Sequence, residues 1–204
     1  VISTYYDGKF VVFDMVSKKF THVADFPGES YIWDMALGSD GRVYGGTYDG
    51  AKLGAVDPQT GEFEDCGNPF DDEGNMYLRH VKNTPAGDIA CTYGFAHKRF
   101  AIYKVREKQF VTLWEDDDTS PIVSILGHLF VSTGDRGMLA LAGEEPWPVE
   151  QPPLPDCPVE GGWTGLHRFS TDDRVFLSTK EHGMWKWIPA YDQLDMIFNA
   201  KVAG

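Results

Sequence analysis

Length, composition and charge limit what this chain can be. It has 204 residues and a net charge of −13 at pH 7, and aromatic residues make up 14% of it. That length can bury one sizeable core, and all-β domains of this size often form a single unit. An acidic chain without a basic stripe argues against nucleic acid or an anionic membrane surface as partners, and no window reaches the roughly 18 apolar residues of a membrane span. The charge remains compatible with neutral sugars, cationic ligands, divalent metals and protein partners.

Short apolar runs separated by turns begin at the first residue. Val1–Phe26 reads as three strands, and the next stretch reads as four. The four expected strands are Tyr31–Leu37, Val43–Thr47, Lys52–Val56 and Glu62–Asp65. Asp-Gly and Pro-x-x-Gly sequences separate them, and glycine supplies the positive φ that tight turns need. Four antiparallel strands in about 40 residues predict one blade of a β-propeller.

The same unit recurs along the chain. The second-strand sequence VYGGTYDG (Val43–Gly50) returns as VISTYYDG, IACTYG, FVSTGDRG and VFLSTKEHG. Third strands follow it as KFVVFDM, AKLGAVDP, FAIYKV, MLALAG and MWKWIP. Self-similarity at a period of about 40 residues is typical of propellers. We therefore predict one all-β propeller domain over 1–204, of about five four-stranded antiparallel blades near 1–28, 29–69, 74–116, 120–158 and 162–204.

Two blades depart from the pattern. The first starts with a second-strand sequence, so it should lack its innermost strand; either the chain closes as an irregular five-bladed ring or it is part of a larger propeller. The abrupt start inside a strand favours the larger propeller. In the fourth blade, PWPVEQPPLPDCP predicts a weak or absent fourth strand, because proline cannot donate to a strand ladder.

The turn and strand motifs carry a family resemblance. Asp40-Gly41-Arg42-Val43-Tyr44-Gly45-Gly46-Thr47 and then Asp57-Pro58-Gln59-Thr60-Gly61-Glu62 resemble the repeat core of bacterial β-propeller families. These include the virginiamycin B lyase-like, gluconolactonase-like (SMP-30), NHL and quinoprotein-like propellers. The resemblance spans nearly the whole chain at the level of blades and implies architecture, without assigning a single family or any catalytic residue.

Cysteines, acidic runs and motifs indicate no metal and no cofactor. Cys66, Cys91 and Cys157 form no C-x-x-C pair, and Cys91 is expected to be a small buried filler. The runs Asp71–Glu73 and Glu115–Asp118 do not match the EF-hand spacing and are expected to be solvated loops. Phosphate-binding, hydrolase and zincin motifs do not occur. The sequence does not decide the cellular location between a bacterial cytoplasm and, if a signal peptide was removed, the periplasm or exterior.

The candidate site follows from propeller geometry. Segments leading into first strands and loops joining second to third strands open on the same face, around the central channel. The first group contains Tyr31, Trp33, Asp34, Tyr77, Arg79, His80, Trp163, His167 and Arg168. The second group contains Tyr5, Tyr6, Asp7, Tyr48, Asp49, Phe95, His97, Lys98, Arg99, Asp135, Arg136, Lys180, Glu181 and His182. Trp185 and Trp187 alternate on a third strand and are expected in the core between blades.

Two functions fit such a face. Aromatic rings stack on sugars, arginine clamps carboxylates, and histidine or tyrosine moves protons near neutral pH. The favoured hypothesis is a binding module for a saccharide, small ligand or protein, using Tyr31, Trp33, Asp34, Tyr48, Arg79, His80, His97, Arg136, Trp163, His167, Arg168 and His182. The alternative is a carbohydrate-active enzyme, a polysaccharide lyase or lactonase-like protein, with His80, His167, His97 and Arg79 as catalytic candidates. Fold alone does not decide between them.

Overall fold

The computed structural model describes residues 1–70, 75–94, 99–168, 174–180 and 183–199, and the side chains of 121, 122, 167 and 168 lie outside that description. Its strands form five antiparallel sheets, each built from consecutive strands. The first sheet contains β1 (Ile2–Ser3), β2 (Lys9–Asp14) and β3 (Lys19–Asp25). The second contains β4 (Tyr31–Leu37), β5 (Val43–Tyr48), β6 (Leu53–Val56) and β7 (Phe63–Gly67).

The remaining sheets repeat the four-stranded order. The third contains β8 (Leu78–Asn83), β9 (Ile89–Tyr93), β10 (Arg99–Lys104) and β11 (Gln109–Trp114). The fourth contains β12 (Thr119–Ile125), β13 (His128–Thr133), β14 (Met138–Ala142) and β15 (Glu145–Pro148). The fifth contains β16 (Gly165–Arg168), β17 (Val175–Thr179), β18 (Gly183–Ile188) and β19 (Gln193–Phe198), with the short 3₁₀ turn η1 (Pro189–Tyr191) before β19.

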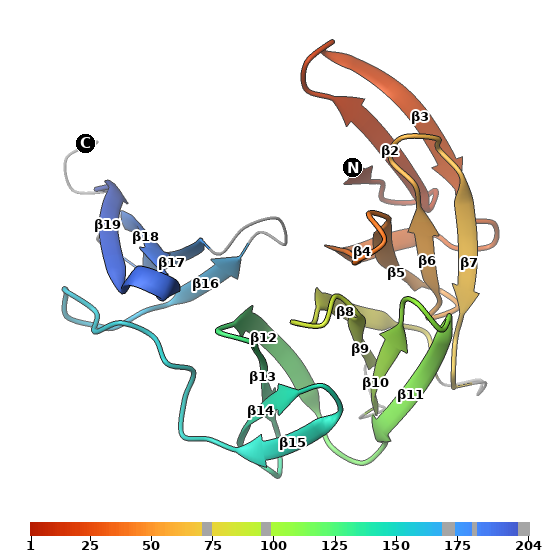
Figure 1. The fold of residues 1–204 in the computed structure, drawn as a ribbon. Helices are drawn as coiled ribbons and strands as arrows, with labels where there is room; N and C mark the ends of the chain where they lie inside the picture. Colours follow the sequence, from red (N-terminus) through yellow and green to blue (C-terminus); the bar gives the residue numbers. More distant parts are fainter. Residues whose placement is uncertain (71–74, 95–98, 169–173, 181–182, 200–204) are drawn as a thin grey trace.

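The five sheets are the blades of an open β-propeller. They stand side by side in an arc, with β4, β8, β12 and β16 on its inner side and the first and last blades separated by a gap (Figure 1). The all-β propeller prediction is confirmed. So is the three-stranded first blade, in which the VISTYYDG segment supplies β1 beside β2.

Local turn chemistry explains why the strands begin and end where they do. Asp57 Oδ1 accepts the backbone N–H of Gln59, and Gly61 takes a φ of 77° to close the turn between β6 and β7. Asp14 Oδ1 accepts the N–H of Val16 in the equivalent turn between β2 and β3. Such aspartate turns mimic a backbone turn, so the repeat motif sets the third-to-fourth connections of the first two blades.

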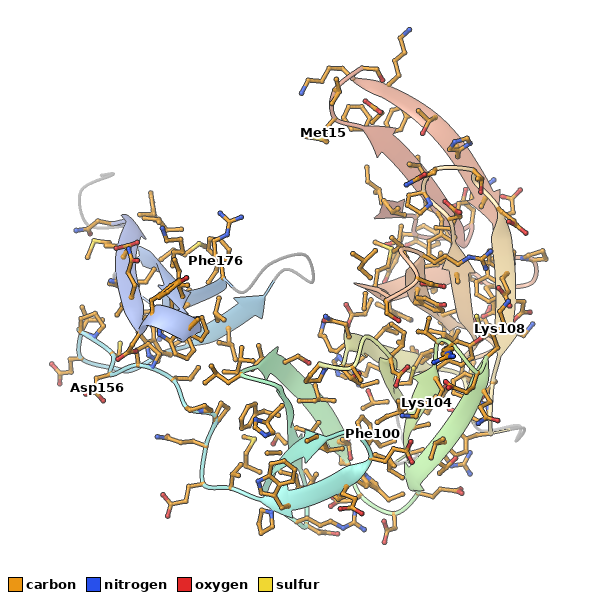
Figure 2. All side chains as sticks on the ribbon, in the orientation of Figure 1. Met15, Phe100, Lys104, Lys108, Asp156 and Phe176 are labelled. Atoms are coloured by element: carbon orange, nitrogen blue, oxygen red, sulfur yellow. The ribbon has the colours of Figure 1, made fainter. Side chains whose placement is uncertain are left out.

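Alternate residues of each third strand face opposite neighbouring blades. Phe10 of β2 lies in one core cluster with Ile32 and Val56 of the second blade. Leu53 of β6 lies in another cluster with Leu78 of the third blade. The pattern continues at β10, where Phe100 packs towards the fourth blade (Figure 2); its cluster partners there are Leu129, Val131, Leu139 and Leu141. The hydrophobic core therefore consists of layers between sheets, which hold the inner strands in place.

Three expectations about individual residues have clear outcomes. Trp185 and Trp187 are 2% and 3% exposed, which confirms their place in the core. Cys91 is fully buried in the cluster between the second and third blades, as expected.

The expectation of a weak or absent fourth strand in blade four was wrong in part, because β15 pairs with β14 through Pro148. Pro146 and Pro148 lie two residues apart, so both ring nitrogens face the open edge, while Val149 N–H donates to the Met138 carbonyl (3.0 Å). Prolines are tolerated at such edges. All four residues of β15 are exposed, which makes it the marginal strand of its sheet.

Candidate functional site

A pocket of about 350 Å³ opens beside the inner strands of the second and third blades. Its lining residues are Trp33 and Asp34 from β4, Tyr77 just before β8, and Arg79 and His80 from β8. The sequence placed all of these residues in segments leading into first strands. The fold brings them together because β4 and β8 lie side by side at the inner edge of adjacent blades (Figure 1).

An aromatic surface continues outward from this pocket. Ring centroids lie 6.0 Å apart between Trp33 and Tyr77, 4.6 Å between Tyr77 and Tyr48, and 5.4 Å between Tyr48 and Tyr31. Two further rings from the first blade, Tyr5 and Tyr6, contact Tyr31. Tyr5, Tyr6 and Trp33 are 55%, 78% and 42% exposed. Three blades thus contribute to one continuous aromatic surface that remains open to a ligand.

Asp34 is held by groups of the neighbouring blade. Its Oδ2 accepts the backbone N–H of Val81 (3.1 Å) and the Nζ of Lys82 (2.8 Å), and its Oδ1 accepts the N–H of Met35 (3.0 Å). The bonds from Val81 and Lys82 link β4 to β8 beside the pocket that Asp34 lines. The Asp34 carboxylate therefore holds β4 and β8 together at the site. Three hydrogen bonds already use most of its capacity to accept from a ligand.

His80 is half-buried in the pocket wall. Burial lowers the pKa of its imidazole below the ordinary value, and the negative charge of Asp34 only partly opposes that effect. A His80 ring in this position is neutral at pH 7, so one ring nitrogen donates a hydrogen bond and the other accepts one. Beside it, the exposed Arg79 supplies a positive charge at the same pocket.

Two buried carboxylates support the loops of this face, and sequence reasoning missed both. Glu29, two residues before β4, accepts the backbone N–H of Gly50 at its Oε2 (2.8 Å). Asp117, two residues before β12, accepts the N–H groups of Asp135 (2.9 Å) and Arg136 (3.2 Å). Each ties the approach to a first strand to the following second-to-third loop. The sequence signal that could have identified them is that each carboxylate lies two residues before the first strand of its blade.

Asp117 also corrects the expectation that the whole Glu115–Asp118 run is solvated. Its residue is only 1% exposed. Burial raises the pKa of its carboxyl, but hydrogen bonds from the backbone of Asp135, Arg136 and Gly134 and from the Thr133 side chain together hold that pKa below its usual range. One member of this acidic run is therefore a structural anion, while Glu115, Asp116 and Asp118 are exposed.

Other predicted site residues lie apart from the pocket. Arg136 pairs with Asp116 (2.7 Å) and lies over the ring of Trp114 (5.1 Å), so its charge is engaged at the junction of the third and fourth blades. Trp163 donates from Nε1 to the Pro155 carbonyl (2.8 Å) and packs against Trp185. His97 and His182 lie outside the described residues; the structure describes His167 and Arg168 only as backbone of β16.

Two other hollows offer less chemistry. A cavity of about 340 Å³ opens near Pro85 and Pro189, and no described residue of its lining has an ionisable side chain. A broader one of about 650 Å³ is lined by Lys104 and Arg106, but the Lys104 ammonium already pairs with Asp88 (3.1 Å) and Glu144 (2.8 Å), and none of the described lining residues is aromatic. The aromatic pocket is therefore the better candidate.

Metal ligands and reactive thiols find little support in the described ranges. Within them, no group of three or more His, Cys, Asp or Glu side chains is arranged to hold a metal ion. Cys66, Cys91 and Cys157 are free. Burial raises the pKa of the Cys66 thiol to about 11, so it is protonated at neutral pH. No helix in the described part of the chain is long and apolar enough to cross a membrane.

Comparison with known proteins supports the fold. No protein-family profile and no curated protein sequence matches the chain. Among solved structures, the chain is similar to the β-propeller domain of Myceliophteria thermophila Cps50 (Swd1), with a TM-score of 0.53 and 13% identity. The match covers 96% of this chain and 67% of the other. It places the chain among the β-propellers as a fold class, and the resemblance to particular bacterial repeat families remains a prediction.

Proposed function

We propose that this chain is a binding module that holds its ligand in the pocket formed by Trp33, Tyr77, Arg79 and His80. The observation that carries the proposal is the joining of this pocket to an exposed aromatic surface. Exposed aromatic patches with a few polar groups beside a hollow are typical of binding sites. The ligand classes that suit it are a saccharide, another small molecule with a flat apolar face, or a protein segment.

Substitution of Trp33 tests the module. Trp33→Ala removes a 42% exposed ring, so the fold should survive while ligand affinity falls about tenfold, the loss of one stacking contact. Titration calorimetry with one neutral and one uronic-acid oligosaccharide measures the effect. Trp147→Ala is the matched control, because that ring is 38% exposed and lies on β15, away from the pocket. Binding unaffected by Trp33→Ala would contradict the proposal.

An enzymatic role at the same pocket is the second candidate. It is favoured by one observation, a neutral His80 beside Arg79, which together provide a base and a clamp for a uronate carboxylate. A polysaccharide lyase would release unsaturated sugar ends from a uronate polymer, detectable by ultraviolet absorbance, and His80→Ala would abolish that release without unfolding the chain. Ligand binding without release of unsaturated ends would reject the enzymatic role and retain only the proposed binding function.

A further inference from the structure

The outer end of the aromatic surface is a cluster of four tyrosines, Tyr5, Tyr6, Tyr31 and Tyr48, here called the tyrosine cluster. Tyr31 is at its centre, with ring centroids 4.3 Å from Tyr5, 5.4 Å from Tyr6 and 5.4 Å from Tyr48. Tyr5 and Tyr6 come from the second-to-third loop of the first blade, Tyr48 from the end of β5, and Tyr31 from the start of β4. Tyr5 and Tyr6 are more than half exposed, so the cluster is a surface and not a core.

Elsewhere this chain covers aromatic rings with its own cations. Lys52 lies over Phe26 (5.9 Å), Arg99 over Phe70 (4.7 Å) and Arg136 over Trp114 (5.1 Å). In the described part of the chain, no lysine or arginine lies over a ring of the tyrosine cluster. The electron-rich faces of these rings are therefore available to a cation from outside.

The charge beside the tyrosine cluster is negative. Asp49 adjoins Tyr48, and its Oδ2 accepts the Ser30 hydroxyl (2.7 Å); it has no cationic partner among the described residues. Burial raises the pKa of the Tyr48 phenol, and the negative charge of Asp49 adds to that effect. Asp7 lies nearby in the first-blade loop but pairs with Lys9 (3.7 Å). Asp49 is thus the carboxylate with unused capacity for a positive group.

We propose that the tyrosine cluster and Asp49 bind an arginine side chain presented by a partner protein. This inference rests on the proposed binding function and names the partner chemistry of its outer end. A guanidinium is planar, stacks on aromatic faces and pairs with a carboxylate through two N–H groups, whereas lysine presents a compact, strongly hydrated charge. The chain's net charge of −13 attracts a basic partner over longer range.

A sugar is less suited to this end of the surface. Stacking alone would use the rings but leave Asp49 without a countercharge, and a uronate would be repelled by it. At the other end, beyond Tyr48, Arg79 lies in the pocket with Trp33. The two ends therefore differ in charge, and separate substitutions can distinguish them.

The test compares two capped glycine peptides that differ at one residue, arginine or its neutral isostere citrulline. By titration calorimetry with the whole chain, the arginine peptide should bind about tenfold more tightly than the citrulline peptide, the preference expected of a cation on aromatic rings beside a carboxylate. Asp49→Asn keeps the acceptor for Ser30 and should reduce that preference to about twofold or less. Tyr6→Ala should weaken binding of the arginine peptide several-fold.

Controls separate this inference from the proposed function. Tyr191→Ala removes an 80% exposed tyrosine from η1 and should change nothing. Equal binding of the two peptides, a preference that survives Asp49→Asn, or no binding of the arginine peptide would each overturn the inference. Saccharide binding that depends on Trp33 and is unaffected by Asp49→Asn would retain the binding module while rejecting the arginine partner.

Discussion

At the scale of single residues, buried carboxylates organise the face that carries the candidate site. Glu29 and Asp117 each stand two residues before a first strand and accept backbone N–H groups from the following second-to-third loop. A buried N–H group without an acceptor has lost its hydrogen bonds to water and gained none, which costs free energy of folding. The carboxylate that accepts from it therefore stabilises the fold. It determines where the loop residues project.

Asp117→Ala should destabilise the fold by about 1–3 kcal/mol at pH 7, because the N–H groups of Asp135 and Arg136 lose their acceptor. The folded-state pKa of Asp117 is depressed, so its contribution is complete above the unfolded-state pKa of about 3.9 and is lost as pH falls through the folded value. Urea unfolding at a series of pH values measures this. The gap between wild type and variant should narrow as the solution is acidified.

Asp116→Ala is the matched control for that measurement. Its carboxylate is 74% exposed and pairs with Arg136 at the surface. Exposed pairs contribute about 0–1 kcal/mol, so this variant should unfold close to wild type. Equal losses for the two aspartates would contradict the assigned role of Asp117.

At the scale of elements, close approach between neighbouring blades depends on small residues in the middle of strands. A Cβ added at Gly54 of β6 would lie 2.3 Å from Cε1 of Phe26, and one added at Gly45 of β5 would lie 2.7 Å from Phe10 Cε1. Both contacts join the first blade to the second. The glycines of the repeat motif therefore provide room for aromatic side chains of the preceding blade.

Gly54→Ala should destabilise the chain by about 1–3 kcal/mol through overpacking against Phe26. Because the obstructing atom belongs to the Phe26 ring, the double variant Gly54→Ala/Phe26→Leu should lose less than the sum of the two single variants. A double-mutant cycle from urea unfolding measures this coupling. Strict additivity would show that the two residues do not share this space.

At the scale of the whole molecule, the first blade of the arc has an apolar sheet face that no described blade covers. On the side of the first blade that faces away from the second, Ile2, Phe20 and Val23 are 49%, 66% and 60% exposed. In the second blade, Val56 occupies the third-strand position that matches Phe13 and is fully buried. The repeat thus places core-type residues where the described chain has no blade to cover them.

The double variant Phe20→Lys/Val23→Thr should reduce binding of a hydrophobic dye and any self-association, since it removes most of an exposed apolar patch. The unfolding midpoint should change little, because both side chains are already exposed and such substitutions usually fall within about 0.5 kcal/mol. Dye fluorescence, light scattering and urea unfolding measure the three quantities. A large fall in the midpoint would show that these residues belong to the core.

The propeller was predictable from the sequence because its signals are local and repeated. Tyr31–Leu37 is a largely apolar run of strand length, and Asp57 and Gly61 set a turn by their own geometry. Trp185 and Trp187 point to one face of the sheet because side chains alternate along a strand with a period of two. Each of these features depends on residues near one another in the chain. Their recurrence across the blades made the fold readable without knowing any contact between blades.

The candidate site was only partly predictable, because contacts between blades join residues far apart in sequence. The sequence predicted Trp33, Arg79 and His80 in segments leading into first strands, and the structure shows that they line one pocket. The bond from Val81 N–H to Asp34 spans two blades and appears only when β4 and β8 are placed side by side. Tertiary structure likewise decided that Arg136 is engaged by Asp116 and that Trp163 packs against Trp185. Local sequence determines the repeat, whereas the packing of neighbouring blades determines which side chains are left free to bind.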